Sequence, residues 1–167
     1  MKKIFFSILC FLFIISLYGK DSKLFINTSA GYISGHETFQ GVATNFGIGY
    51  NANKYLSIEL VLDNWYRYDD YSASDTNTGI SMLLHGYPIN FKGNTLDIFA
   101  GYGYNMNYWR YVGGNIGRHL FPAPLFGAGY YRSFKYFDLG FVYKKDFFTG
   151  RINKQNEQYL ISVKKRF

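Results

Sequence analysis

The side chains that could carry chemistry are few, and the histidines among them are scattered. His36, His85 and His119 fall in different segments, and Cys10 is the only cysteine. A metal site would require at least two histidines to meet with a carboxylate, and the spacing gives no reason for that. The Gly-x-Gly pairs follow an alternating pattern and do not open a helix, so they do not indicate a phosphate-binding loop. We therefore expect neither a metal nor a cofactor.

A second set of ionisable residues recurs at alternate positions, on the face of each segment that also carries glycines. Its members are Glu59, Asp63, His85, Asp97, Asp138, Lys144, Lys164 and Arg166. If this face is enclosed, charges of both signs share a small interior and should be paired. We expect Glu59 to lie near His85, and Asp138 near Lys164 or Arg166. These contacts would form a mixed-charge plug toward one end of the fold, without an open pore.

The elements that must position these residues are alternating segments of about ten residues, the length of a tilted strand that crosses a bilayer. The clearest segment places Leu56, Ile58, Leu60 and Leu62 on one face and Ser57, Glu59, Val61 and Asp63 on the other. Eight such segments can be counted. Short turns begin at Asn51, Phe91 and Arg132, and longer polar connections are expected at 34–41, 67–77, 109–118 and 146–157. This regular alternation predicts an all-β, eight-stranded antiparallel up-and-down transmembrane β-barrel.

Alternation alone does not decide which face points inward, because a soluble lipocalin-like cup would invert the two faces. The glycines favour the membrane barrel. They share the face of the charged residues, and a narrow lumen needs positions without side chains to admit large ones. These glycines are Gly47, Gly49, Gly101, Gly103, Gly127, Gly129 and Gly140. The soluble binding barrel remains a further alternative.

The first segment indicates export. Lys2 and Lys3 precede an apolar run that ends near Gly19, which is typical of a cleaved signal peptide. We expect residues 1–19 to be removed and residues 20–167 to form one domain. Removal takes Cys10 and two lysines, so the formal charge falls from +7 to +5. This modest and scattered excess gives little support for nucleic-acid binding.

The chain has 17 Tyr, 17 Phe and 2 Trp, and it ends on Phe167. Aromatic rings in this number suit the two interfacial girdles of a membrane barrel. With its alternating last strand, the chain resembles the small outer-membrane β-barrels of Gram-negative bacteria, the family of the OmpA transmembrane domain and OmpX. The resemblance implies that Phe167 is the assembly signal read by the barrel assembly machinery. Lys165 departs from the pattern, because the family usually has an apolar or aromatic residue there.

Some barrels of this size are enzymes that act on lipid A. The sequence is partly similar to the lipid A palmitoyltransferase family, with Pro122 and Pro124 in the sixth segment, Asp63 high on the third, and His36 in the first loop. The resemblance would make His36 and Asp63 catalytic and the prolines a lateral lipid gate. However, Asn64 stands where that family has serine, and its amphipathic helix is missing. The deacylase family's His-x-Ser is absent from the seventh segment.

The sequence is therefore expected to encode a non-enzymatic, monomeric outer-membrane barrel with a filled polar interior, serving envelope integrity or surface interaction. Its expected partners are outer-membrane lipid, lipopolysaccharide and the barrel assembly machinery. Residues expected near the outer loops could contact lipopolysaccharide phosphates or a host surface: Trp109, Arg110, Tyr111, Arg118 and Lys154. The alternative is a lipid A acyltransferase.

Overall fold

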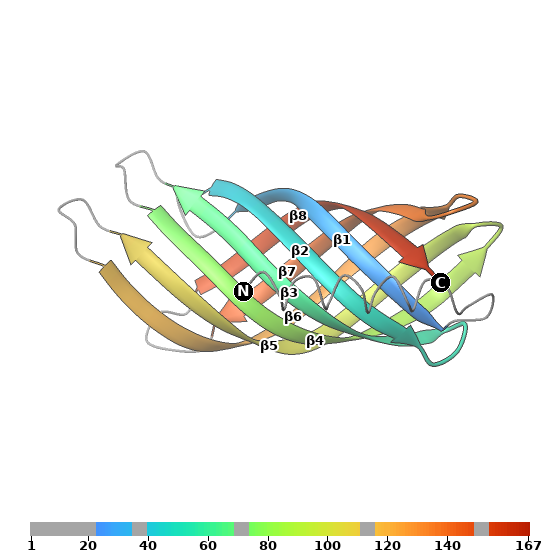
Figure 1. Ribbon diagram of the computed structural model, residues 1–167, viewed down its shortest axis with the longest axis horizontal. Helices are drawn as coiled ribbons and strands as arrows, with labels where there is room; N and C mark the ends of the chain where they lie inside the picture. Colours follow the sequence, from blue (N-terminus) through green and yellow to red (C-terminus); the bar gives the residue numbers. More distant parts are fainter. Residues whose placement is uncertain (1–22, 35–39, 69–73, 111–115, 149–153) are drawn as a thin grey trace, which may run out of the picture.

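The computed structural model describes residues 23–34, 40–68, 74–110, 116–148 and 154–167 (Figure 1). These residues form eight strands: β1 (Leu24–Ser34), β2 (Gln40–Asn51), β3 (Leu56–Tyr68), β4 (Ser74–Phe91), β5 (Asn94–Arg110), β6 (Ile116–Ser133), β7 (Asp138–Phe148) and β8 (Lys154–Arg166). Within the described residues, no helix is long and apolar enough to cross a membrane.

The eight strands form one closed barrel, in which each strand pairs antiparallel with its neighbours in the sequence. The strands run obliquely around its long axis (Figure 1). β1 also pairs with β8, from Phe25↔Arg166 to Ser34↔Glu157, and the Phe167 N–H donates to the Leu24 carbonyl at 3.2 Å. Closure pairs both edges of the sheet. The predicted fold class is confirmed.

One end of the barrel carries the three predicted short turns; we call it the short-turn end, and the opposite end the loop end. Between β4 and β5, Lys92 and Gly93 have φ angles of 49° and 77°. Positive φ at both central residues is the geometry of a two-residue hairpin turn that matches strand twist. Between β2 and β3, the Asn53 side chain accepts hydrogen bonds from the Tyr55 and Leu56 N–H groups at 2.7 and 2.9 Å.

Several strands extend further toward the loop end than the sequence predicted. Residues 67–77, 109–118 and 146–157 were expected to be loops, but β3 continues to Tyr68 and β4 starts at Ser74. Likewise, β5 reaches Arg110 and β7 reaches Phe148. The prediction was wrong because an inward-facing polar residue has lumen partners, so a strand can continue where the apolar alternation stops.

β3 shows the two faces of the wall most clearly. Leu56, Ile58, Leu60 and Leu62 point outward with 45, 44, 53 and 47% exposure, whereas Ser57, Glu59, Val61 and Asp63 point inward with 1, 1, 5 and 2%. A cup that holds an apolar ligand would place the leucine row inside. The lipocalin-like alternative is therefore wrong for this chain.

The inward glycines make room for the largest lumen side chains. A Cβ atom at Gly49 would meet the ring of Phe25, and one at Gly127 would meet Phe99. At Gly140 it would meet both the ring of Tyr131 and the Tyr130 carbonyl oxygen. The lumen is so narrow that a large ring on one strand requires a glycine on its neighbour.

Outward aromatic rings gather at both ends, and the outward side chains between them are mainly aliphatic. Near the loop end these rings are Tyr32, Tyr66, Tyr104, Tyr108 and Tyr159, and near the short-turn end Tyr50, Tyr55, Phe91, Tyr130, Phe134 and Tyr136. Two aromatic belts that flank an apolar band are typical of a surface that passes through a bilayer.

A methyl group at Gly140 should destabilise the barrel because its neighbours are a packed ring and a fixed carbonyl oxygen. We expect Gly140→Ala to lower the free energy of unfolding in urea by about 1–3 kcal/mol. Gly86→Ala is the matched control: its Cβ would lie 3.6 Å from the Ile98 side chain, an ordinary contact, and should change little. Equal stability of the two variants would contradict the proposed packing.

Candidate functional site

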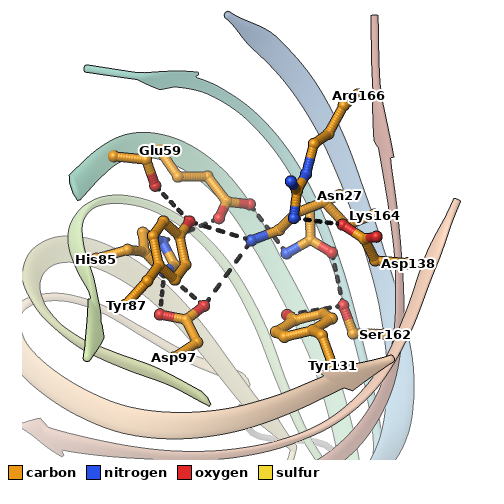
Figure 2. A network of polar contacts seen from close by, with 11 residues as sticks. Asn27, Glu59, His85, Tyr87, Asp97, Tyr131, Asp138, Ser162, Lys164 and Arg166 are labelled. Carbon is orange, nitrogen blue, oxygen red and sulfur yellow. Dashed lines mark hydrogen bonds and ion pairs between the residues drawn. The ribbon is translucent and has the colours of Figure 1, made fainter. Parts of the chain in front are cut away.

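Enclosed polar residues form a network of contacts toward the short-turn end (Figure 2). His85 on β4 lies between two carboxylates: its Nε2 is 3.0 Å from Glu59 on β3, and its Nδ1 is 3.0 Å from Asp97 on β5. All three side chains are buried. The expected proximity of Glu59 and His85 is therefore present, and Asp97 joins them.

Lys164 on β8 enters the same cluster from the opposite wall. Its Nζ lies 3.8 Å from Asp97 and 3.4 Å from the hydroxyl oxygen of Tyr87. It also lies 4.6 Å from the ring centroid of Phe25 and 4.7 Å from that of Tyr131. Aromatic faces attract a cation where water is scarce, so the lysine is held by rings as well as by a carboxylate.

Hydrogen bonds connect further lumen side chains to this cluster (Figure 2). Asn27 donates to Glu59 at 3.1 Å and accepts from Ser162 at 2.6 Å, and Ser162 in turn accepts from Tyr131 at 3.2 Å. Six strands thus contribute side chains to one cluster, which fixes their relative register.

Asp138 was expected to face Lys164 or Arg166. Its Cα is the ladder partner of Lys164, but its carboxylate pairs with Arg166 at 2.8 Å. Lys164 points deeper into the lumen. The Asp138–Arg166 pair lies at the mouth of the short-turn end, where the Arg166 side chain is half exposed.

A second cluster lies near the middle of the barrel. Lys144 Nζ contacts the Asp63 carboxylate at 2.5 Å and the Asp146 carboxylate at 3.5 Å. Ser81 donates to Asp63 at 2.7 Å, and Gln158 donates to Asp146 at 2.8 Å. All five side chains are buried, so one lysine is shared by two enclosed carboxylates.

A third cluster fills the loop end. Arg67 pairs with Asp75 at 2.5 Å and donates to Asn156 at 2.6 Å, and its guanidinium lies 4.4 Å from the ring centroid of Trp65. The expected plug near one end is therefore only part of the picture. Charged and polar side chains occupy the lumen over its described length.

Four partners in these clusters were missed at the sequence level: Arg67, Asp75, Asp146 and Asn156 all lie in stretches expected to be exposed loops. Their positions in the sequence could have revealed them, because every second residue of a strand faces the same side. Asp146 continues the inward row of Asp138 and Lys144 on β7, and Asn156 continues that of Lys164 on β8. Extending the period of two beyond the last apolar residue would have found both.

The geometry around His85 does not resemble a catalytic arrangement. Both ring nitrogens face carboxylates, and the neighbouring Ser57 hydroxyl contacts Tyr87 at 2.6 Å. A nucleophilic serine would have to bond a histidine nitrogen directly. Across the described residues, no group of three His, Cys, Asp or Glu could hold a metal ion.

Of the two residues of the alternative enzyme site, the structure describes Asp63. Asp63 was expected high on its strand, but it lies five residues short of the loop-side end of β3 and is 2% exposed. Its carboxylate is engaged by Ser81 and Lys144. His36 lies outside the described residues, as does the expected signal peptide.

The two prolines of the sixth segment lie within β6, where Pro122 pairs in register with Tyr104 and Pro124 with Tyr102 on β5. The ladder between β6 and β7 runs from Leu125↔Asp146 to Ser133↔Asp138. It therefore begins just after the second proline. Proline has no N–H to give to a ladder, and both prolines lie where β6 extends past its pairing with β7.

Among the described residues, the cavity inside the barrel is small. A cavity of about 30 Å³ lies among Asn27, Glu59, His85 and Tyr131, which is room for about one water molecule. A larger hollow of about 500 Å³ lies at the short-turn end and is lined by Lys23, Lys54, Tyr87 and Arg166, among others. This hollow is an open mouth outside the filled lumen.

The fold is that of the small eight-stranded outer-membrane β-barrels. Neisserial surface protein A has a TM-score of 0.75 and 13% identity over 87% of this chain and 98% of its own. Ail, the attachment invasion locus protein of Yersinia pestis, has a TM-score of 0.59 and 12% identity, over 87% of this chain and 97% of its own. The N-terminal barrel domain of Pseudomonas aeruginosa OprF has a TM-score of 0.56 and 16% identity, over 87% of this chain and 98% of its own. No family model and no curated sequence matches the chain.

Removing the shared lysine of the middle cluster should leave two buried carboxylates without a cation. We expect Lys144→Met to cost about 3–5 kcal/mol of unfolding free energy, and Asp63→Asn in the same chain to restore part of it. The adjacent Lys145→Met is the control, because Lys145 points outward and pairs with Glu157 at the surface; it should cost under about 1 kcal/mol. Similar losses for Lys144 and Lys145 would contradict the buried network.

Proposed function

We propose that the protein is a small, non-enzymatic outer-membrane β-barrel of a Gram-negative bacterium, exported by its signal peptide and serving envelope integrity or surface interaction. The observation that carries the proposal is the division of the wall into an outward apolar band and an inward polar network. In a bilayer the backbone must satisfy its own hydrogen bonds, which a closed barrel does.

The filled lumen supports a role that does not involve transport. Side chains from the three charged clusters occupy the interior, and the cavity between them holds about 30 Å³. A protein of this shape presents its outer surface and its two ends to partners. Outer-membrane lipid, lipopolysaccharide and the barrel assembly machinery, with Phe167 as the assembly signal, are the partners that fit this proposal.

The proposal is tested with the mature chain folded in detergent or lipid. We expect an unheated sample to migrate differently from a boiled one in a gel, because a closed barrel stays compact until heated. In planar bilayers the pure protein should give no large, steady conductance, because its lumen is filled. A mature chain that is freely water-soluble without detergent would overturn the membrane assignment, and a steady open channel would overturn the filled lumen.

A lipid A acyltransferase is the second candidate, and the observation that favours it is that Pro122 and Pro124 lie where β6 extends past its ladder with β7. A lateral opening at this place could admit an acyl chain. We expect mass spectrometry of lipid A to show the same species in cells with and without the gene. An added acyl chain that disappears with His36→Ala or Asp63→Ala would favour the enzyme instead.

A further inference from the structure

Exposed lysines encircle the short-turn end of the barrel. One precedes β1, one lies in each short turn, and one lies at the end of β8; we call the set the basic ring: Lys23, Lys54, Lys92, Lys135 and Lys165. The set therefore includes every connection at the short-turn end and the two strands, β1 and β8, that close the barrel. The lysines are therefore distributed around the barrel and do not form a patch on one side.

Each lysine of the basic ring lies over an exposed or half-exposed aromatic side chain. The distances from Nζ to the ring centroid are 5.8 Å for Lys23 and Tyr50, 4.8 Å for Lys54 and Tyr55, 5.1 Å for Lys92 and Phe91, 5.1 Å for Lys135 and Tyr136, and 5.3 Å for Lys165 and Phe167. Aromatic rings of this kind sit at the headgroup level of a bilayer. The ammonium groups therefore lie at the same level.

Within the described residues, no lysine of the basic ring forms an ion pair with a side-chain carboxylate. The side-chain carboxylate at the short-turn mouth is that of Asp138, which is bound by Arg166. At the loop end, two of the cations have carboxylate partners: Arg67 pairs with Asp75, and Lys145 pairs with Glu157. The basic ring is thus available to an external anion.

We propose that the basic ring binds the phosphate groups of anionic phospholipids in the leaflet that surrounds the short-turn end. This inference rests on the proposed function, because the barrel must span a bilayer. A lipid surface fits the arrangement better than a folded protein does, since lipid surrounds the barrel on all sides and a protein would cover one. The lysines also border the apolar band directly, as Leu56 and Leu139 are exposed just beyond them.

The basic ring also accounts for the unusual residue near the chain end. Lys165 occupies an outward position of β8, where an apolar or aromatic side chain was expected. Its Nζ lies over Phe167, so the ammonium group is directed toward the headgroup level. At that depth a lysine is favourable near anionic lipid.

The test compares reconstituted wild-type protein with a variant in which four of the five lysines of the basic ring are neutralised, by Lys54→Gln, Lys92→Asn, Lys135→Gln and Lys165→Gln. Asparagine is chosen at position 92 because it tolerates the positive φ there. The association of spin-labelled phosphatidylglycerol is measured against that of phosphatidylcholine. We expect wild type to prefer phosphatidylglycerol by roughly two- to fivefold at low salt, and this preference to disappear in the variant and at high salt.

The matched control is Arg118→Gln, an exposed cation at the loop end, which should keep the preference. Equal association of both lipids with wild type, or a preference that survives in the four-residue variant, would overturn the inference. Reduced cellular assembly of that variant with unchanged lipid preference would also overturn it, in favour of a protein partner. If wild type does not insert at all, the gel-mobility test fails first, and the proposed function is at fault.

Discussion

The pairing of β1 with β8 is the contact on which the other features depend. It runs over ten residue pairs, from Phe25↔Arg166 to Ser34↔Glu157, and it turns an open sheet into a ring without edges. Eight strands close on a lumen just wide enough for side chains. Closure therefore imposes two separate requirements, an outer face compatible with the surroundings and an inner face packed like a protein core.

Many of the side chains packed on the inner face are charged or polar instead of apolar. A buried charge is tolerated where it is paired and hydrogen-bonded, and each cluster here supplies partners from different strands. Glu59, His85, Asp97 and Lys164 come from β3, β4, β5 and β8. Because a slip of one residue would turn these side chains outward, we infer that the network specifies strand register more than it adds stability.

Much of this could be predicted from the sequence because a strand has a fixed period of two. The strand number, the three short turns, the inward glycines and the outward leucine row all follow from that period. A β-bulge breaks it: the β4–β5 register shifts between Gly86 and Ile89. The bulge restores Ile89 and Phe91 to the outer face, where unbroken alternation would have turned them inward.

The partners inside the lumen could not be predicted in the same way. The alternation of a strand shows which residues point inward. Which inward side chains contact each other depends on the stagger of the strands and on the length of each side chain. Asp138 shows the limit, because its ladder neighbour is Lys164 while its carboxylate binds Arg166. The loop boundaries failed for a related reason: Arg67 and Asp75 look solvated in sequence, yet they pair in the lumen.

The prolines of β6 have a structural explanation that requires no enzyme. β5 and β6 remain paired up to Arg110↔Ile116, whereas the β6–β7 ladder begins only at Leu125↔Asp146. The part of β6 that contains Pro122 and Pro124 therefore extends past its ladder with β7. An extended strand edge is a template for unwanted pairing, and proline blunts it by removing the donor N–H. Pro122 and Pro124 thus protect the part of the β5–β6 hairpin that extends beyond β7.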